Sequence, residues 1–275
     1  MSDIPDEPFP DTLEHAIEIA CQAHPELDPD SFTFPEQGQQ NFVFFADDKV
    51  IRLPRNAWTA QSMPREVQAL GLLKDCPVKI PQVIDYDPDV HIMILTKVRG
   101  APLDDKAVQK MSKQDQKHIA KQLAQFMSFI HQGVRLTPKD RDVLRSDSSY
   151  FHKQIKEKLR EIEQENINEG LDLIIEDIQT YLFAYETLED SDVLIHGDIM
   201  FSNILYDPDT KDIGIVDFTG MEMGYRHLDF RKLLDYPRPF FDMIIESYQD
   251  ITGITPDLKL VKTAHAALKS YHREL

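Results

Sequence analysis

The chain has 275 residues and a formal net charge of −18, with 41% hydrophobic and 28% charged residues. This composition excludes a disordered chain, and its apolar runs are far shorter than the ~18 residues of a membrane span. Such acidity repels a phosphate backbone, which excludes general nucleic-acid binding and favours a cationic partner. Acids outnumber bases in both residues 1–98 and 99–275, so charge alone does not locate a cationic site.

The cysteines and the N-terminal residues bear on the cellular compartment. The opening residues, MSDIPDEPFP, are acidic and proline-rich and lack the basic and apolar regions of a secretory signal. Two cysteines, Cys21 and Cys76, are too few for a disulfide framework or a zinc site. We therefore expect a cytoplasmic protein without membrane association, and nothing demands more than a monomer.

The first 98 residues combine runs of β-branched and aromatic residues with two stretches of helical periodicity. Polar or proline-containing turns separate these runs. The predicted elements are a helix over residues 11–23, a hairpin over 41–45 and 49–53, a helix that starts at Ser62 and Pro64 and ends at Lys74, and strands over 81–84 and 91–98. This order predicts a small antiparallel sheet with a helix packed against it.

From residue 99 onward, helical periodicity dominates. The predicted elements are a helix over residues 115–131, helical segments over 151–186 with a break near Gly170, short strands over 193–195, 204–206 and 213–216, and two helices between 240 and 275 that Thr252-Gly253 separates. We therefore predict an α+β protein with a β-rich lobe over residues 1–98 and a larger, mostly helical lobe over residues 99–275.

The most informative stretch lies within these short strands. His196 and Asp198 follow an apolar strand, Asn203 comes five residues after Asp198, and Asp217 ends the next apolar run, 213–216. Phosphoryl transfer needs magnesium held by oxygen ligands and a carboxylate that orients the attacking hydroxyl. Two carboxylates and an amide at this spacing can supply both, and protein kinases share the same Asp-to-Asn step of five residues.

The motifs His196-Gly197-Asp198, Asn203 and Ile215-Val216-Asp217-Phe218 resemble the aminoglycoside phosphotransferase and choline kinase superfamily. The resemblance covers roughly residues 35–255, and it implies a two-lobed, protein-kinase-like fold. Nucleotide and magnesium are then expected between the lobes. By this resemblance Asp198 is the catalytic base, Asn203 and Asp217 hold magnesium, and His196 and Asp229 support the catalytic loop.

The resemblance also assigns a nucleotide site in the first lobe. Arg52 occupies the place of a strand lysine that contacts the phosphates, with Glu66 as its ion-pair partner, and Gly38 lies in the phosphate loop. The residues expected to border the base of ATP or GTP are Leu95, Thr96, Lys97 and Val98. Two departures stand out: the loop EQGQQN has a single glycine, and arginine replaces the lysine.

The acceptor follows less directly from the residues. Asp229 follows Asp217 by only twelve positions, which leaves no room for an activation loop or a peptide-docking platform. A small-molecule acceptor is therefore expected, and the acidic chain favours a cationic one, an aminoglycoside antibiotic whose phosphorylation causes resistance. One alternative is a kinase of another small molecule: a macrolide, choline, homoserine or a sugar. Residues 50–55 also resemble macrolide phosphotransferases. A further alternative is a weakly active nucleotide-binding regulator.

Overall fold

A computed structural model describes residues 9–35, 40–145, 150–164, 172–186 and 193–271. The chain divides into two compact units: unit 1 comprises residues 1–74 and 81–98, and unit 2 comprises residues 75–80 and 99–275. This division also falls after Val98, but residues 75–80 go with unit 2. The reason is local pairing, because Lys79 forms a bridge with Gly214 and its carbonyl accepts the Ile215 amide at 2.8 Å.

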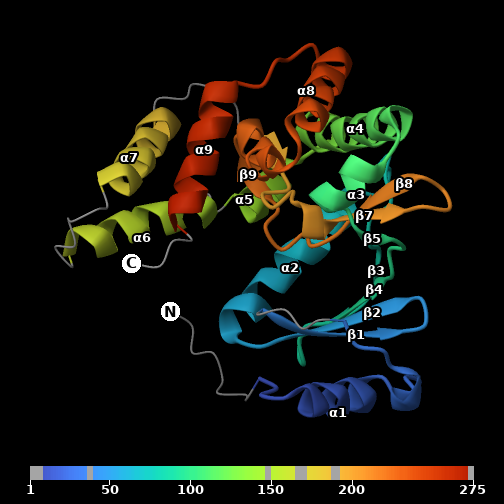
Figure 1. Ribbon diagram of the computed structural model, residues 1–275. Coiled ribbons are helices and arrows are strands. Elements are labelled where there is room, and N and C mark those ends of the chain that lie inside the picture. The colour runs from blue at the N-terminus through green and yellow to red at the C-terminus, as the bar shows by residue number, and fades with distance from the viewer. Residues whose placement is uncertain (1–8, 36–39, 146–149, 165–171, 187–192, 272–275) are drawn as a thin grey trace. The chain divides into compact units, whose positions relative to one another are not determined.

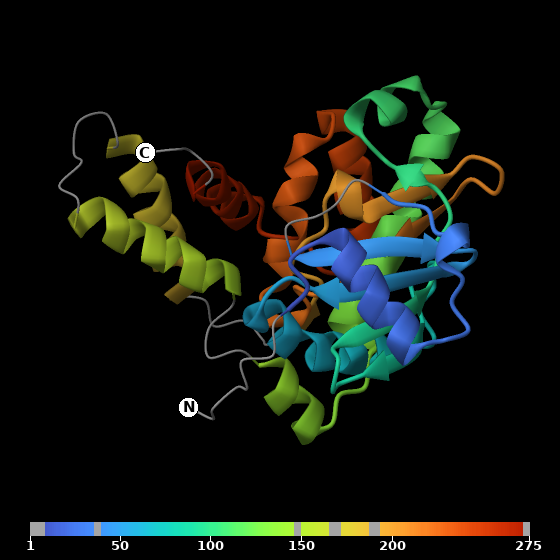
Figure 2. The ribbon, with the colours of Figure 1, turned by 90° about the horizontal axis from the view of Figure 1, so that it is seen from below.

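Unit 1 is built on an antiparallel sheet in the order β1-β2-β4-β3. Its strands are β1 (Asn41–Ala46), β2 (Lys49–Pro54), β3 (Val83–Asp87) and β4 (Ile92–Thr96). Helix α1 (Leu13–Ala23) lies across one face, where Ala16 and Ala20 pack against buried Phe44 and Ile51 (Figures 1 and 2). Helix α2 (Ala57–Leu72) lies on the opposite face (Figure 1).

The start of α2 differs from the prediction of a helix beginning at Ser62 and Pro64. The helix begins at Ala57, and the Asn56 side chain caps it by accepting the Thr59 amide at 2.9 Å. Pro64 therefore lies inside the helix, where it removes one backbone donor. The N-cap and the burial of Met63 and Leu70 offset that loss.

Unit 2 holds the short strands within a mostly helical frame. Strands β5 (Ala101–Pro102), β7 (Ile204–Asp207) and β8 (Asp212–Ile215) form one antiparallel sheet. Strands β6 (Val193–Ile195) and β9 (Glu222–Gly224) pair separately. The helices are α3 (Asp105–Lys110), α4 (Lys113–Ser128), α5 (Pro138–Leu144), α6 (Tyr150–Gln164), α7 (Asp172–Glu186), α8 (Arg238–Thr252) and α9 (Leu258–Tyr271). The sequence analysis does not predict the short strands β5 and β9.

Helix α4 supplies the main buried stripe of unit 2, as its periodicity predicts. Ile119, Leu123, Phe126 and Ile130 are all buried, and α4 packs against α8. The predicted helix to residue 131 ends instead in a π-helical turn, Phe129–Gly133, which widens the last turn and carries His131.

A second core joins α6, α7, α9 and β6 through buried residues such as Ile155, Ile178 and Ala264. Gly253 ends α8 in the left-handed conformation at φ 72°, where the sequence predicts the separation of two helices. The expected break near Gly170 lies outside the described residues. The small antiparallel sheet and the larger helical part confirm the predicted fold class.

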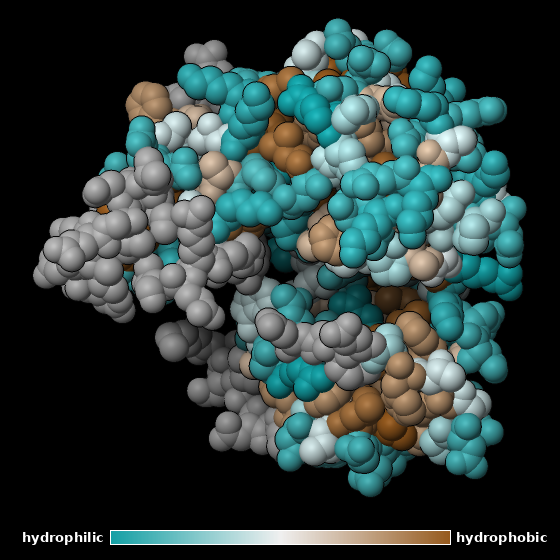
Figure 3. Space-filling model, viewed as in Figure 1, coloured by the Kyte–Doolittle hydropathy of each residue, from teal (hydrophilic) through white to brown (hydrophobic). Residues whose placement is uncertain are grey.

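Hydrophilic residues cover most of the surface visible in Figure 3, in keeping with the high charge. Within the described ranges, none of the helices combines the length and apolar character that a bilayer span needs.

Candidate active site

The loop after β6 carries the predicted catalytic motif and depends on a glycine at its first turn. Gly197 has φ 78°, a conformation that side chains disfavour, and a Cβ there would lie 2.5 Å from the Gly220 carbonyl oxygen. The motif glycine therefore lets the chain turn sharply against residue 220.

Asp229 holds the backbone of this loop through hydrogen bonds. Its Oδ2 accepts the His196 amide at 3.0 Å, and its Oδ1 accepts the Gly197 amide at 2.8 Å. His131 of the π-helical turn contacts the same carboxylate through Nε2 at 3.1 Å, and Tyr248 contacts His131 Nδ1 at 2.9 Å. Burial raises the pKa of Asp229, but the His131 hydrogen bond and the loop amides outweigh it, so the pKa lies below its ordinary value.

His196 is a structural member of the loop in its contacts. Its side chain is buried between the rings of Phe126 and Phe218, and its Nδ1 accepts the Asp198 amide at 3.2 Å. In the neutral ring the proton then resides on Nε2, which has no hydrogen-bond partner among the described residues. The ring thus fixes the backbone of Asp198.

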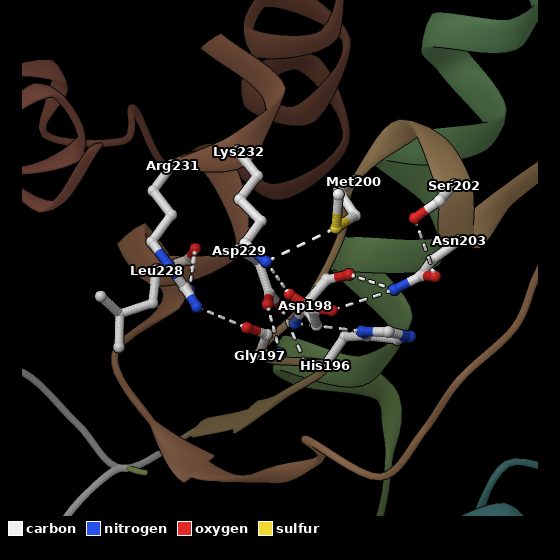
Figure 4. A network of polar contacts seen from close by, with 10 residues as sticks. All are labelled: His196, Gly197, Asp198, Met200, Ser202, Asn203, Leu228, Asp229, Arg231 and Lys232. Atoms are coloured by element: carbon white, nitrogen blue, oxygen red, sulfur yellow. Dashed lines mark hydrogen bonds and ion pairs between the residues drawn. The ribbon is translucent and has the colours of Figure 1, made fainter. Parts of the chain in front are cut away.

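Asp198 is held from two sides. Figure 4 shows its carboxylate between Lys232 and Asn203: the Lys232 ammonium binds Oδ1, and Asn203 Nδ2 donates to Oδ2 at 3.1 Å. Partial burial raises the pKa of Asp198, but the ammonium of Lys232, with Arg231 and His196 nearby, brings the pKa below its ordinary value. The carboxylate therefore stays ionised near neutral pH.

Asn203 and Asp217 meet at one end of the β7–β8 hairpin. The register pairs Ile204 with Ile215, and the Val216 amide donates to the Asn203 carbonyl at 3.0 Å, which sets Asp217 beside Asn203. Asp217 has φ 65°, and its exposed carboxylate makes no hydrogen bond or ion pair to any described residue. Positive φ is uncommon outside glycine and typical of functional sites.

These two side chains fit a magnesium ion in their donor chemistry. Magnesium prefers oxygen ligands and often takes only one or two carboxylates, with phosphates and water completing its shell. The Asp217 carboxylate and the Asn203 amide oxygen offer such donors. No group of three or more His, Cys, Asp or Glu residues suited to a metal ion occurs in the described parts of the chain.

In unit 1, Arg52 of β2 and Glu66 of α2 form a buried ion pair. Arg52 Nη1 lies 2.6 Å from Glu66 Oε1, and their side chains are 10% and 2% exposed. The guanidinium is thus paired with a carboxylate inside unit 1. Gly38 lies outside the described residues.

Of the four residues predicted to border a nucleotide base, Leu95 and Thr96 end β4, and Lys97 and Val98 follow it. Leu95 is buried, and Thr96 donates its amide to the Gln82 carbonyl at 2.9 Å. The Lys97 amide donates to the Asp48 carbonyl at 2.7 Å, while its ammonium lies 4.1 Å from the centre of the Phe45 ring. Val98 follows directly and is half-buried.

Sequence reasoning missed three side chains that complete the loop: His131, Arg231 and Lys232. Arg231 donates to the Leu228 and Gly197 carbonyls, each at 2.6 Å. Arg231 and Lys232 follow Asp229 by two and three residues, so their proximity to that aspartate was the available signal. His131 ends a segment that carries a clear helical pattern, but nothing local indicates its contact with Asp229.

Comparisons with known proteins agree with this geometry. A sequence model described as the phosphotransferase enzyme family (APH) matches residues 31–264. A search of curated proteins finds no match. The family match confirms the resemblance drawn from the sequence, and with it the predicted enzyme class, a phosphotransferase with an alcohol group as acceptor.

Solved structures resemble the chain over nearly its whole length. APH(2'')-IIIa with GDP and kanamycin has 20% identity and a TM-score of 0.78, covering 94% of this chain and 88% of that chain. The streptomycin–ATP complex of APH(2'')-IIa has 19% identity and a TM-score of 0.69, covering 92% and 87%. The macrolide 2'-phosphotransferase MphH from Brachybacterium faecium has 18% identity and a TM-score of 0.70, covering 94% and 89%. At these identities the likeness establishes the fold.

Proposed function

The chain belongs to the phosphotransferase enzyme family, and from this premise we propose that it is a magnesium-dependent kinase that transfers the γ-phosphate of ATP or GTP to a hydroxyl of an aminoglycoside antibiotic. The observation that carries the proposal is the arrangement of Asp198, Asn203 and Asp217 on one braced loop and one hairpin. We place this activity in a cytoplasmic monomer, where phosphorylation of the drug causes resistance.

Asp198 is the proposed catalytic base. Each carboxylate oxygen has two lone-pair directions, so the contacts with Lys232 and Asn203 leave room for one more hydrogen bond at either oxygen. An acceptor hydroxyl that donates there is oriented toward the γ-phosphorus, and Asp198 takes its proton as transfer proceeds. The brace from Asp229 keeps the loop amides, and hence this carboxylate, in one position.

Asn203 and Asp217 are the proposed magnesium ligands. The ion, when bound, neutralises phosphate charge and aligns the leaving group. Arg52 is proposed to contact the nucleotide phosphates while Glu66 holds its guanidinium in place. In the segment 95–98, Thr96 and Lys97 already donate their amides within unit 1, so the base is expected to meet the carbonyls and the Val98 amide.

The acidic chain supports a polycationic acceptor, because carboxylates gain from binding several ammonium groups. Two acids of unit 2 are already neutralised, since Asp235 pairs with Lys269 and Asp242 with Arg238, both at 2.8 Å. A macrolide is the second candidate, favoured by the likeness to macrolide 2'-phosphotransferases over 94% of this chain or more. Such an acceptor needs a roomier and less acidic site.

One mass-spectrometry screen tests the proposal. Purified protein with magnesium is incubated with pooled aminoglycosides, macrolides and small amino alcohols, with ATP and GTP in separate tubes. We expect a phosphate-sized mass gain on an aminoglycoside. A gain on a macrolide or an amino alcohol instead would keep the chemistry and overturn the acceptor.

The matching variant is Asp198→Ala. It removes the proposed base and leaves the first unit untouched, so transfer should be lost while nucleotide binding, measured by calorimetry, is retained. Unchanged transfer by Asp198→Ala would refute the catalytic assignment. Nucleotide binding without transfer to any compound, in the wild type, would favour a nucleotide-binding regulator.

A further inference from the structure

A lysine that the family motifs do not include contacts the loop that carries Asp198. Lys232 begins the 3-10 segment Lys232–Asp235, just after the segment Arg226–Phe230 that carries Asp229. Its ammonium binds Asp198 Oδ1 and lies 3.5 Å from Met200 Sδ (Figure 4). The side chain is only 17% exposed, so most of its hydration has been replaced by these contacts.

The contacts of Lys232 do not use all of its N–H donors. An ammonium has three N–H donors. One binds Asp198, one meets a thioether sulfur that is a weak acceptor, and no described residue accepts the third. A partly buried cation with a free donor next to a reacting carboxylate is typical of a site that receives an anionic group.

We propose that Lys232 is a further catalytic residue, whose ammonium binds an oxygen of the phosphoryl group while that group passes to the acceptor hydroxyl beside Asp198. This inference rests on the proposed function of Asp198. If Asp198 hydrogen-bonds the hydroxyl, the nucleophilic oxygen lies about 3 Å from the carboxylate and about 3–3.5 Å from phosphorus. Lys232, bound to the same carboxylate, is then within reach of a phosphoryl oxygen.

The step balances without a further reactant. A bond forms between the acceptor oxygen and the γ-phosphorus, the bond between that phosphorus and the bridging β–γ oxygen breaks, and the nucleoside diphosphate leaves. The hydroxyl proton passes to Asp198. Negative charge is spread over the phosphoryl oxygens in transit, and a compact, rotatable ammonium can follow them while it keeps its contact with Asp198.

The loop is anchored so that Lys232 need not hold it together. Asp229 and Arg231 already fix the backbone of residues 196–197 through three hydrogen bonds, none of which involves Lys232. Removing the ammonium is therefore expected to leave the fold intact and to reduce only the stabilisation of the transition state.

The test compares Lys232→Met with Lys232→Arg and with a matched control. Lys269→Met removes an ammonium from an exposed ion pair with Asp235, on the same 3-10 segment but away from Asp198. With the acceptor identified by the screen, we expect Lys232→Met to lower kcat about 100- to 1000-fold, with less than about threefold change in the KM for nucleotide. Lys232→Arg should recover part of kcat, and Lys269→Met should match the wild type.

A second measurement does not depend on turnover. Magnesium, ADP and aluminium fluoride together mimic the phosphoryl group in transit, whereas ADP with magnesium does not. Calorimetry should give Lys232→Met the wild-type affinity for ADP and a loss of at least tenfold in the additional affinity that aluminium fluoride brings. Circular dichroism melting checks that the variant is folded.

The outcomes separate the two proposals. Suppose that the wild type transfers phosphate. The role of Lys232 is then overturned, and the proposed function stands, if Lys232→Met keeps its kcat. The same holds if Lys232→Met loses kcat only together with its melting temperature and its ADP affinity. A wild type that neither transfers phosphate nor gains affinity from aluminium fluoride overturns the proposed function, and the role of Lys232 falls with it.

Discussion

Replacing Asp229 by asparagine tests the brace under the catalytic loop while it preserves the shape of the side chain. The carboxylate accepts the His196 and Gly197 amides and contacts His131; Asp229, His131 and His196 are buried, and Gly197 is partly buried. An asparagine offers only one acceptor oxygen, so its NH2 group must face a donor. If the oxygen keeps His196 and His131, the Gly197 amide loses its partner.

The expected cost follows from these contacts. An unsatisfied buried amide costs about 1–3 kcal/mol, and each of the two remaining hydrogen bonds loses about 1 kcal/mol when its acceptor becomes neutral. Asp229→Asn should therefore lower the free energy of unfolding by about 3–5 kcal/mol, which corresponds to roughly 10 °C in melting temperature for a chain of this size. Transfer should fall on the order of 100-fold, because the displaced loop carries Asp198.

Urea unfolding at several pH values checks both the size and the origin of this loss. The pKa of folded Asp229 lies below its ordinary value of 3.8, so its stabilisation is fully present above that value and is lost as the pH falls through the lower, folded pKa. The difference between wild type and Asp229→Asn should thus be constant from about pH 5 to 8 and shrink only in stronger acid. Asp209→Asn, at an exposed turn, is the control. A difference below about 1 kcal/mol at neutral pH would refute the reasoning.

Two further substitutions probe the glycine turn and the ion pair of unit 1. Gly197→Ala must adopt φ 78° and places its Cβ 2.5 Å from the Gly220 oxygen, whereas Gly253→Ala faces a similar φ of 72° with no atom within 4 Å. In urea unfolding, Gly253→Ala should lower the free energy of unfolding by about 1 kcal/mol and Gly197→Ala by clearly more. Only Gly197→Ala should lose transfer. Equal losses of stability would contradict the steric argument. Glu66→Gln removes the carboxylate charge beside the buried Arg52 guanidinium. Calorimetry should find weaker nucleotide binding, and urea unfolding a loss of stability of about 2–4 kcal/mol. Wild-type nucleotide affinity in Glu66→Gln would argue against a phosphate-binding role for Arg52.

The elements that the sequence predicts well are those whose signal is local. The β1–β2 hairpin has β-rich runs on both sides of a polar turn, and the buried stripe of α4 repeats at helical spacing over its whole length. The predicted catalytic motif also has a local signal, because Asp198 and Asn203 are five residues apart and a loop suffices to bring them together.

The misses arise where distant contacts decide the structure. Proline is a strong local signal for a helix start, yet the Asn56 cap and the buried side chains of α2 override it at Pro64. Strand β9 has three residues, and its identity as a strand comes from pairing with β6 some thirty positions earlier. Likewise, residues 75–80 go with unit 2 through the contact of Lys79 with β8.

The segment that begins at Asp229 shows how a local spacing and distant contacts act together. Its geometry explains why this short segment positions the loop of residues 196–198. In a 3-10 helix, side chains three residues apart lie one above the other. Asp229 and Lys232 have this spacing in consecutive 3-10 segments, so both side chains reach the loop of residues 196–198. Asp229 accepts a backbone amide of the loop, and Lys232 binds the Asp198 carboxylate. His265 Nδ1 of α9 contacts the intervening Arg231 carbonyl at 2.8 Å, which ties this segment to the helical core. The stability of the core and the position of the proposed base are therefore linked through a single stretch of chain, and a change that loosens it should affect both.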